Sequence, residues 1–365
     1  MRTQLSTAAG VGRKRFAAVV LAVSLGSTMA ACGSGSDSKS GKDSVDFNKL
    51  SLADLYAGAK KEGTLTLNSG ASDDDLKIIA ADFNKLYPGI KITHFEQQGE
   101  DSAAKMAAEA KAGVHKTDVL DIDQNTIYAV AQLGLLAKYT PPEGAKFDTR
   151  LKKPWYTGYR IQIKPISYNT DKVKGADIPT GYNDLLDPKW KNKICAESDE
   201  ISVFGNMLDA MGEKAGLAYW KTLHENGLRL ISGQSNLVQA LESGDCSIAQ
   251  SANVHSIAKD MDKGAPVAWV KTDPLYAIAG AIGVAEDAPH PYAARLWVNY
   301  VLSDRGQESL VDDYRIPANP AVKPKEKELQ TGDYTMVLPT DKMLKDFTKL
   351  NNQYYEVTGR PVVGQ

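Results

Sequence analysis

The sequence lacks the short motifs of common catalytic and metal sites. It contains no Gly-x-Ser-x-Gly turn, no His-Glu-x-x-His pair, no Walker loop for nucleotide phosphates and no Gly-x-Gly-x-x-Gly loop for dinucleotides. The histidines are scattered without metal-ligand spacing, at His94, His115, His224, His255 and His290. These absences argue against the corresponding hydrolases, metalloenzymes and nucleotide-binding enzymes, and we expect no cofactor.

An excess of positive charge is also missing. The 365 residues include 43 Lys and Arg against 45 Asp and Glu, a formal net charge of −2. Residues 1–31 hold four basic and no acidic residues, so their removal leaves 39 against 45, or −6. A protein that neutralises nucleic-acid phosphates needs a basic surface. The composition therefore predicts no nucleic-acid partner.

No apolar run is long enough to form a stable transmembrane helix. The run from Phe16 to Gly26 is short, follows the basic residues Arg13 to Arg15, and precedes Met29-Ala-Ala-Cys32. This order is typical of a secretory signal, and small residues before Cys32 resemble the bacterial lipobox, whose cysteine is diacylated. We expect a lipoprotein signal peptide at residues 1–31 and a lipid anchor at Cys32. An ordinary signal with an incidental cysteine is the alternative.

The segment after Cys32 is rich in Gly, Ser and charged residues. It buries too little apolar surface to order itself, so residues 32–48 are interpreted as a flexible tether. The protein would then lie at the outer face of the cytoplasmic membrane. The remaining body, about 315 residues, is long enough for two domains.

Cysteine is scarce, with three residues in the whole chain. If Cys32 carries lipid, Cys195 and Cys246 remain in a protein that has left the cytoplasm, where disulfides form. Both lie near the start of predicted strands, and a bridge between neighbouring strands would close a loop of 51 residues. Two buried free thiols are the alternative.

Strand and helix patterns alternate twice along the body. After an acidic first turn, apolar residues recur at helical spacing from Leu76 to Leu86. In the first series the expected elements are strands at 64–67, 90–95 and 118–122 with helices at 72–86 and 101–112. The second has strands at 193–196, 228–231 and 245–250 with helices at 202–211, 213–225 and 235–243. Such β-α-β orders predict parallel sheets flanked by helices.

Two such series predict an α/β protein with two lobes, each a mixed, mostly parallel sheet flanked by helices. We expect lobe 1 at residues 49–124 and 277–325, and lobe 2 at residues 125–276 and 326–365. Because the chain crosses between the lobes, a hinge and a ligand cleft should form there.

The sequence is similar to the solute-binding proteins of bacterial ABC importers, in the branch with ferric-iron, putrescine and phosphonate binders. The matching pieces occur in the family's order: Phe83-Asn-Lys-Leu-Tyr-Pro-Gly-Ile90, Glu109-Ala-Lys-Ala-Gly113 with Thr117-Asp-Val119, Tyr168-Asn-Thr-Asp171, Asp184-Leu-Leu-Asp-Pro-Lys-Trp190, Glu242-Ser-Gly-Asp245, Ala293-Ala-Arg-Leu-Trp297 and Ser303-Asp-Arg-Gly-Gln307. The resemblance implies a type II periplasmic-binding-protein-like fold. It also implies a monomer that closes on one solute, hands it to a membrane permease and catalyses no reaction.

The resemblance also bears on iron. Iron-binding members usually carry two adjacent tyrosines at the positions of Val254 and His255, so both phenolates are missing here. Those members often place a carboxylate where Asp123 stands, and a histidine near Ser72. Ferric iron prefers several hard oxygen donors. We therefore expect a small organic solute with an anionic group, and keep a ferric site with Asp123 and His255 as the alternative.

Polar residues at the predicted strand ends supply the first candidate ligand-binding residues. Ser69 and Ser72 lie where a strand meets a helix N-terminus, which can bind a carboxylate or phosphate. Asp123 lies at a similar point and could meet an ammonium group or a metal. Tyr159 and Arg160 lie at the expected crossing, and Arg160 could pair with an anion. As plain turn, cap, aromatic and surface residues, none of the five requires a ligand.

Further candidates come from the second series. The polar residues Ser251, Asn253 and His255 follow the strand expected at 245–250, at an edge where α/β sheets bind ligands. Ser202 and Ser235 are expected to cap helices and then to donate to a ligand, and Tyr276 to form a stacking wall or a core aromatic. The rival functions are a secreted hydrolase with Ser251, His255 and Asp123, and a sensor that reports to a receptor.

Overall fold

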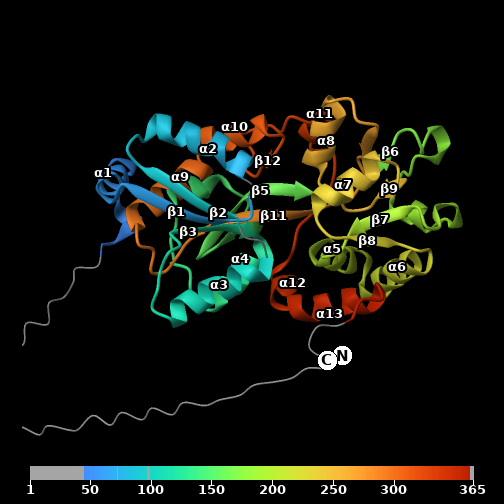
Figure 1. Cartoon of the computed structure of the whole chain (residues 1–365), viewed down its shortest axis with the longest axis horizontal. Helices are drawn as coiled ribbons and strands as arrows, with labels where there is room; N and C mark the ends of the chain where they lie inside the picture. The colour runs from blue at the N-terminus through green and yellow to red at the C-terminus, as the bar shows by residue number, and fades with distance from the viewer. Residues whose placement is uncertain (1–44, 72, 97–98, 362–365) are drawn as a thin grey trace, which may run out of the picture. The chain divides into compact units, whose positions relative to one another are not determined.

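The computed structural model describes residues 45–71, 73–96 and 99–361 (Figure 1). The expected signal peptide, Cys32, most of the tether and Ser72 lie outside the described residues. Residues 46–365 cluster into one compact unit. Within the described ranges, no helix has the length and apolar character needed to cross a membrane.

The first of two sheets is built from both ends of the body. Its strand order is β12-β5-β11-β3-β1-β2, with β13 added to β11 and β4 to β5. β1 pairs in parallel with β2 and β3, whereas β11 runs antiparallel to β3 and β5. The strands are β1 (Thr64–Ser69), β2 (Lys91–Glu96), β3 (Val119–Asp123), β4 (Lys152–Lys153), β5 (Tyr156–Ile163), β11 (Leu275–Val284), β12 (Ile316–Pro317) and β13 (Met336–Val337).

The second sheet has the order β10-β6-β9-β7-β8. β7 pairs in parallel with β8 and β9, and β6 pairs antiparallel with β9 and β10. Its strands are β6 (Ile166–Asn169), β7 (Ile194–Glu197), β8 (Arg229–Ile231), β9 (Ile248–Ala249) and β10 (Val267–Val270). The expected α/β fold with two mixed sheets is confirmed. Antiparallel pairing is more extensive than expected, because β5, β6, β10 and β11 run along the chain's passages between the sheets.

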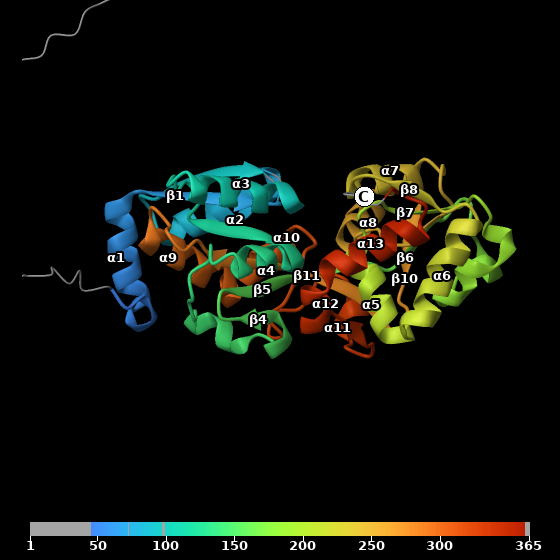
Figure 2. The same ribbon diagram turned by 90° about the horizontal axis from the view of Figure 1, so that it is seen from below.

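Helices flank both sheets (Figure 2). The first sheet is accompanied by α1 (Leu52–Glu62), α2 (Asp73–Leu86), α3 (Gly99–Lys111), α4 (Gln124–Gln132), α9 (Pro291–Leu302) and α10 (Asp304–Asp312). The second is accompanied by α5 (Ile201–Met211), α6 (Glu213–Glu225), α7 (Gln234–Glu242), α8 (Val254–Asp262), α12 (Asp341–Lys345) and α13 (Phe347–Val357). Short pieces are α11 (Lys327–Gln330) and the 3-10 helices at Phe47–Lys49, Pro142–Lys146, Thr149–Leu151, Gly175–Asp177, Tyr182–Leu186 and Pro188–Trp190.

Local sequence explains where several helices begin and end. Ser51 caps α1 in a reciprocal capping box with Asp54, and Gly63 ends the helix in the left-handed conformation. Helix α9 is apolar around most of its circumference and is therefore buried, as its position against α1 and β11 requires. Its Trp297 ring lies 5.1 Å from Phe83 of α2, which ties two helices into the first core.

The C-terminal helix belongs to the second core. Tyr354 of α13 packs against Trp220 of α6 and Phe204 of α5, with both ring centroids 5.4 Å away. Helix α13 therefore packs beside elements more than a hundred residues earlier, whereas β13, which also lies in residues 326–365, pairs with β11 of the first sheet.

We expected the second lobe to begin at residue 125, but the segment after this residue remains with the first sheet. Residues 124–163 contribute α4, β4 and β5 to the first sheet, not the second. β5 is buried along almost its whole length and pairs with the fully buried β11, which explains why it lies inside a sheet and does not form a crossing segment. The chain passes to the second sheet only after Ile163 and returns before Leu275.

Two expected helix caps and one strand also need correction. α5 and α7 begin one residue before Ser202 and Ser235, with Glu200 and Gly233 at the N-cap positions. Each serine thus lies in the first turn. The strand expected at 245–250 is reduced to Ile248–Ala249.

The expected disulfide is present. Cys195 of β7 and Cys246, two residues before β9, form a bridge with their Cα atoms 5.9 Å apart. The pairing follows from the sheet, because β7 and β9 are parallel neighbours with Cys195 opposite Ala249. Both side chains are buried among Leu237, Leu241 and their neighbours.

Reduction of this bridge should destabilise the protein. The loop spans 51 residues, and the chain-entropy model gives a loop of that size about 4 kcal/mol. We expect Cys246→Ser, or the wild type in reductant, to lose a large part of this value in urea unfolding. Thiol labelling of the denatured, unreduced residues 47–365 should find neither cysteine free. Labelling of both cysteines would contradict the bridge.

Candidate functional site

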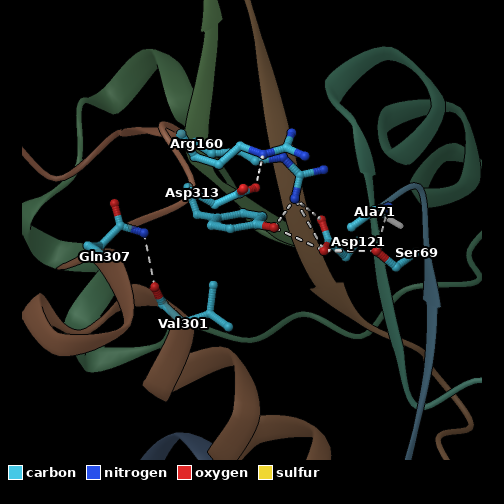
Figure 3. A network of polar contacts seen from close by, with 9 residues as sticks. Ser69, Ala71, Asp121, Arg160, Val301, Gln307 and Asp313 are labelled. Atoms are coloured by element: carbon cyan, nitrogen blue, oxygen red, sulfur yellow. Dashed lines mark hydrogen bonds and ion pairs between the residues drawn. The ribbon is translucent and has the colours of Figure 1, made fainter. Parts of the chain in front are cut away.

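A buried network centred on Asp121 joins three strands of the first sheet (Figure 3). The Asp121 carboxylate of β3 accepts hydrogen bonds from Ser69 Oγ at 3.1 Å, Tyr159 Oη at 2.9 Å and Arg160 Nη1 at 3.1 Å. Ser69 Oγ in turn accepts the backbone N–H of Ala71 at 3.0 Å. A charge removed from water needs such partners. The network brings three of the candidate ligand-binding residues, Ser69, Tyr159 and Arg160, together around a buried acid.

A glycine permits this network. β11 lies between β5 and β3, and Gly280 of β11 stands opposite Arg160. A Cβ at position 280 would lie 2.5 Å from Arg160 Nε, a distance that Cβ atoms do not tolerate. Position 280 must therefore carry no side chain if Arg160 is to reach Asp121.

Tyr159 is a neutral phenol in this environment. Burial raises the pKa of Tyr159 far above its ordinary value of 10, and the neighbouring Asp121 carboxylate raises it further. The nearby Arg160 opposes the shift without reversing it. Tyr159 therefore keeps its proton, donates a hydrogen bond to Asp121 and is not prepared to bind a metal ion as a phenolate.

A second arginine lies on the same side of the first sheet. Arg315 Nε donates to Asp313 Oδ2 at 3.3 Å, and Asp313 Oδ1 accepts from Lys259 Nζ of α8 at 2.7 Å. Both arginines line one small pocket, whose wall consists of Ala71, Leu76, Ile79, Tyr159, Arg160, Ser309, Leu310, Asp313 and Arg315. The pocket combines an apolar side from α2 with a charged side from β5 and the segment after α10.

His255 lies in the first turn of α8 and is buried. Burial lowers the pKa of His255 well below 6.5, and the positive charges of Arg315 and Lys164 lower it further. Asp313 opposes this effect. The imidazole is therefore neutral at physiological pH and lies within electrostatic reach of the charged side of the pocket.

A buried ion pair lies where the chain leaves the first sheet. Lys164, directly after β5, places its Nζ 2.9 Å from Glu200 Oε2 at the N-cap position of α5, and both side chains are about 95% buried. Burial raises the pKa of Glu200, and Lys164 opposes this rise. The pair ties the passage between the sheets to a helix of the second sheet.

Asn125 and Ser202 make a direct contact between helices of the two sheets. Asn125 Nδ2 in the first turn of α4 donates to Ser202 Oγ in the first turn of α5. Asp123 caps α4 by accepting from the backbone N–H groups of Asn125 and Thr126, each at 3.0 Å. The contacts of Asp123 are those of a helix cap, as one of its two interpretations expected. Ser202 lies where helices of the two sheets meet.

The remaining candidates take structural positions. Ser251 Oγ accepts the Glu197 backbone N–H at 3.1 Å and holds neighbouring strand ends together. Asn253 is the N-cap residue of α8, although its side chain makes no capping bond. Ser235 is exposed on α7, and Tyr276 packs edge-on against Tyr182 with ring centroids 5.0 Å apart.

Neither a catalytic triad nor a metal site is assembled in the described part of the chain. No hydrogen bond joins Ser251, His255 and Asp123 there. In the same ranges, no group of three or more His, Cys, Asp or Glu residues is placed to hold a metal ion. The proposed hydrolase arrangement therefore finds no support in the geometry.

Sequence reasoning missed the charged partners of the site: Asp121, Lys164, Glu200, Lys259, Asp313 and Arg315. Two of them carried a usable signal. Asp121 interrupts the apolar strand Val119–Asp123, and Lys164 interrupts the apolar stretch 161–166. A charge inside a buried strand requires a buried partner, although the sequence does not say which one.

Comparison with known proteins gives a family. Residues 79–335 match the model of the bacterial extracellular solute-binding protein family. The chain is 22% identical over 254 residues to iron uptake protein A1 of Synechocystis, with 63% of this chain and 69% of that protein covered. It is 24% identical over 310 residues to a periplasmic protein of Salmonella typhimurium provisionally named for 2-aminoethylphosphonate binding, with 79% and 90% covered.

A solved structure agrees on the fold. AfuA from Actinobacillus pleuropneumoniae, with fructose-6-phosphate bound, superposes with a TM-score of 0.69 at 20% identity, covering 82% of this chain and 99% of that one. This likeness confirms the type II periplasmic-binding-protein fold. Since the family model spans well over half of the chain, the protein belongs to the bacterial extracellular solute-binding protein family, as a non-enzymatic, extracytoplasmic solute-binding protein of an ABC importer.

Proposed function

We propose that this protein captures a small organic anion beside Arg160, Arg315 and His255 and delivers it to its permease. The supporting observation is the balance of charge at the site. Three cations at or beside the pocket (Arg160, Arg315 and Lys259) face two carboxylates (Asp121 and Asp313), while His255 is neutral. One positive charge is in excess, and a carboxylate, phosphate or phosphonate would balance it. Arginine suits such groups because its guanidinium binds them with two parallel hydrogen bonds.

The same charges disfavour ferric iron. A trivalent cation prefers several anionic oxygen ligands, but Tyr159 is protonated and the Asp121 carboxylate already accepts three side-chain donors. Asp123, one of the two expected iron ligands, accepts from the N-terminus of α4. Iron remains the alternative solute, because several relatives are named for iron uptake or ferric-iron binding.

Anchoring and closure complete the proposal. The lipobox-like sequence supports a lipid anchor at Cys32, which would hold a monomeric protein near its permease. We propose lobes of residues 46–163 with 275–338 and of residues 166–270 with 340–361, hinged where the chain passes between the sheets. Solute-driven closure of two such lobes is a common transition. Permease and ATPase genes beside this gene would favour import over a sensor role.

A thermal-shift screen of residues 47–365 tests the solute class. The panel contains phosphonates, sugar phosphates, organic acids, polyamines, and ferric salts with and without citrate. A ligand at 100 times its dissociation constant adds about 2.7 kcal/mol of stability, which raises the melting temperature visibly. We expect a rise with one anionic organic class. A rise with ferric salts alone would replace this proposal by the iron alternative.

Arg315→Gln should weaken binding of the solute found in that screen. Loss of a charge-assisted hydrogen bond costs about 1.5–3 kcal/mol, so the dissociation constant should rise on the order of tenfold or more. Arg150→Gln is the matched control, because Arg150 is exposed and pairs with Asp148. Isothermal titration calorimetry measures both variants. Equal affinity of Arg315→Gln and the wild type would place the anion elsewhere.

The neutral state of His255 predicts a pH dependence of ligand-free stability. Because its folded-state pKa is lowered, the unfolded chain binds more protons as pH falls below about 6.5, and folding stability decreases. We expect His255→Gln to remove part of this decrease, up to about 1.4 kcal/mol per pH unit. Urea unfolding at pH 7.5, 6.5 and 5.5 gives the difference, with the half-exposed His115→Gln as control. Identical slopes for wild type and His255→Gln would show that folding does not lower the pKa of His255.

A further inference from the structure

A strained turn follows helix α10 and leads into β12 of the first sheet. We call the first sheet with its helices the first half of the protein, and the second sheet with its helices the second half. Tyr314 has a φ of 60°, in the left-handed region where a bulky residue is rarely found. Its backbone N–H donates to Val311 O at 3.0 Å, and that of Arg315 to Leu310 O at 2.9 Å, the two bonds of a Schellman motif. Glycine is the usual residue at this position, so retention of a tyrosine indicates that its side chain has a role.

The side chain of Tyr314 reaches helix α8, which packs on β10 of the second sheet and also contacts β5 of the first. Its hydroxyl donates to Asp262 Oδ2 at the last residue of α8. Lys325 Nζ lies 3.4 Å from the Tyr314 ring centroid and 3.8 Å from Asp262 Oδ2, so a cation supports both partners of this contact.

The residue before Tyr314 makes a second bond to the same helix. Asp313 Oδ1 accepts from Lys259 Nζ at 2.7 Å, while its other carboxylate oxygen accepts from Arg315. Lys259 and Asp262 are three residues apart and therefore share one face of α8. Two consecutive residues of the turn thus hold two positions one turn apart on a single helix.

The segment after the turn belongs to the first sheet. Ile316 and Pro317 form β12, which pairs with β5 opposite Ile161 and Arg160. The Ala318 N–H donates to Tyr159 O at 3.0 Å. Any movement of α8 relative to the turn would therefore be transmitted to the strand edge that carries Tyr159, Arg160 and Arg315.

We propose that the Asp313–Tyr314 turn is a clamp that fastens α8 to the first half of the protein, and that Asp313 is the positioning residue that presents Arg315 to the solute. We take the arrangement in this structure as the closed one, which the bonds to Lys259 and Asp262 favour before a solute arrives. A solute then meets a protein whose closed state is already partly populated. Less of the binding free energy is needed to close the protein, so the affinity for the solute rises. The role of Arg315 in this proposal rests on the proposed function, whereas the clamp itself does not.

Single-molecule FRET on the ligand-free protein tests the clamp directly. Dyes are placed on cysteines introduced at the exposed Leu133, next to α4, and Lys221 of α6, so that they report on the two halves. We expect Tyr314→Phe and Lys259→Gln each to increase the ratio of open to closed molecules on the order of two- to tenfold, the effect of losing one hydrogen bond. Lys263→Gln is the control, because its 2.7 Å ion pair with Asp260 lies within the end of α8.

Two further variants separate a clamp from a general structural role. Tyr314→Phe should have no further effect in an Asp262→Ala background, which removes the acceptor of the Tyr314 hydroxyl. Tyr314→Gly should relieve the left-handed strain and maintain stability in urea while it opens the protein, which a purely structural residue would not do. Unchanged FRET distributions in Tyr314→Phe and Lys259→Gln would overturn the clamp. Failure of every organic anion to bind, with the FRET changes present, would overturn only the proposed solute class.

Discussion

A buried carboxylate is the constraint on which the candidate site depends. Asp121 is almost completely removed from water, and a lone charge there would cost several kcal/mol. Ser69, Tyr159 and Arg160 meet that cost with hydrogen bonds from β1 and β5. Arg160 reaches across β11 because position 280 is glycine. The order of strands in the first sheet and the geometry of the site are thus consequences of one another.

Charged pairs also determine how the two sheets are joined. Lys164 and Glu200 form a buried pair at one passage of the chain, and Lys259 connects α8 to Asp313 after α10. Removing one member of a buried pair leaves the other charge buried without a partner, which destabilises the protein. The intact pair itself adds little stability, so its main effect is to favour one arrangement of the two sheets. A hinged binding protein benefits from such contacts, because they exist in one arrangement of the halves and are broken in another.

The electrostatic surroundings support the proposed solute class, which the family alone leaves open. Relatives of similar distance are named for iron and for an aminophosphonate. In this chain burial keeps Tyr159 protonated and His255 neutral, and cations predominate around them. Such surroundings suit an anion with its own hydrogen-bond acceptors. A metal site would need the opposite shifts, with deprotonated oxygen ligands and few nearby cations.

The sequence by itself determined the α/β class and the family, because hydrophobic periodicity and ordered local motifs are local properties. It also predicted the Cys195–Cys246 bridge, because only two cysteines remain if Cys32 carries lipid, and it named Ser69, Tyr159 and Arg160 among the candidates. Only the tertiary structure decided that β5 lies in the first sheet and that Asp123 is a helix cap. It also decided which cations pair with the buried acids Asp121 and Glu200. Pairing of strands and of buried charges depends on which distant segments pack together, and that choice minimises unpaired polar groups over the whole core.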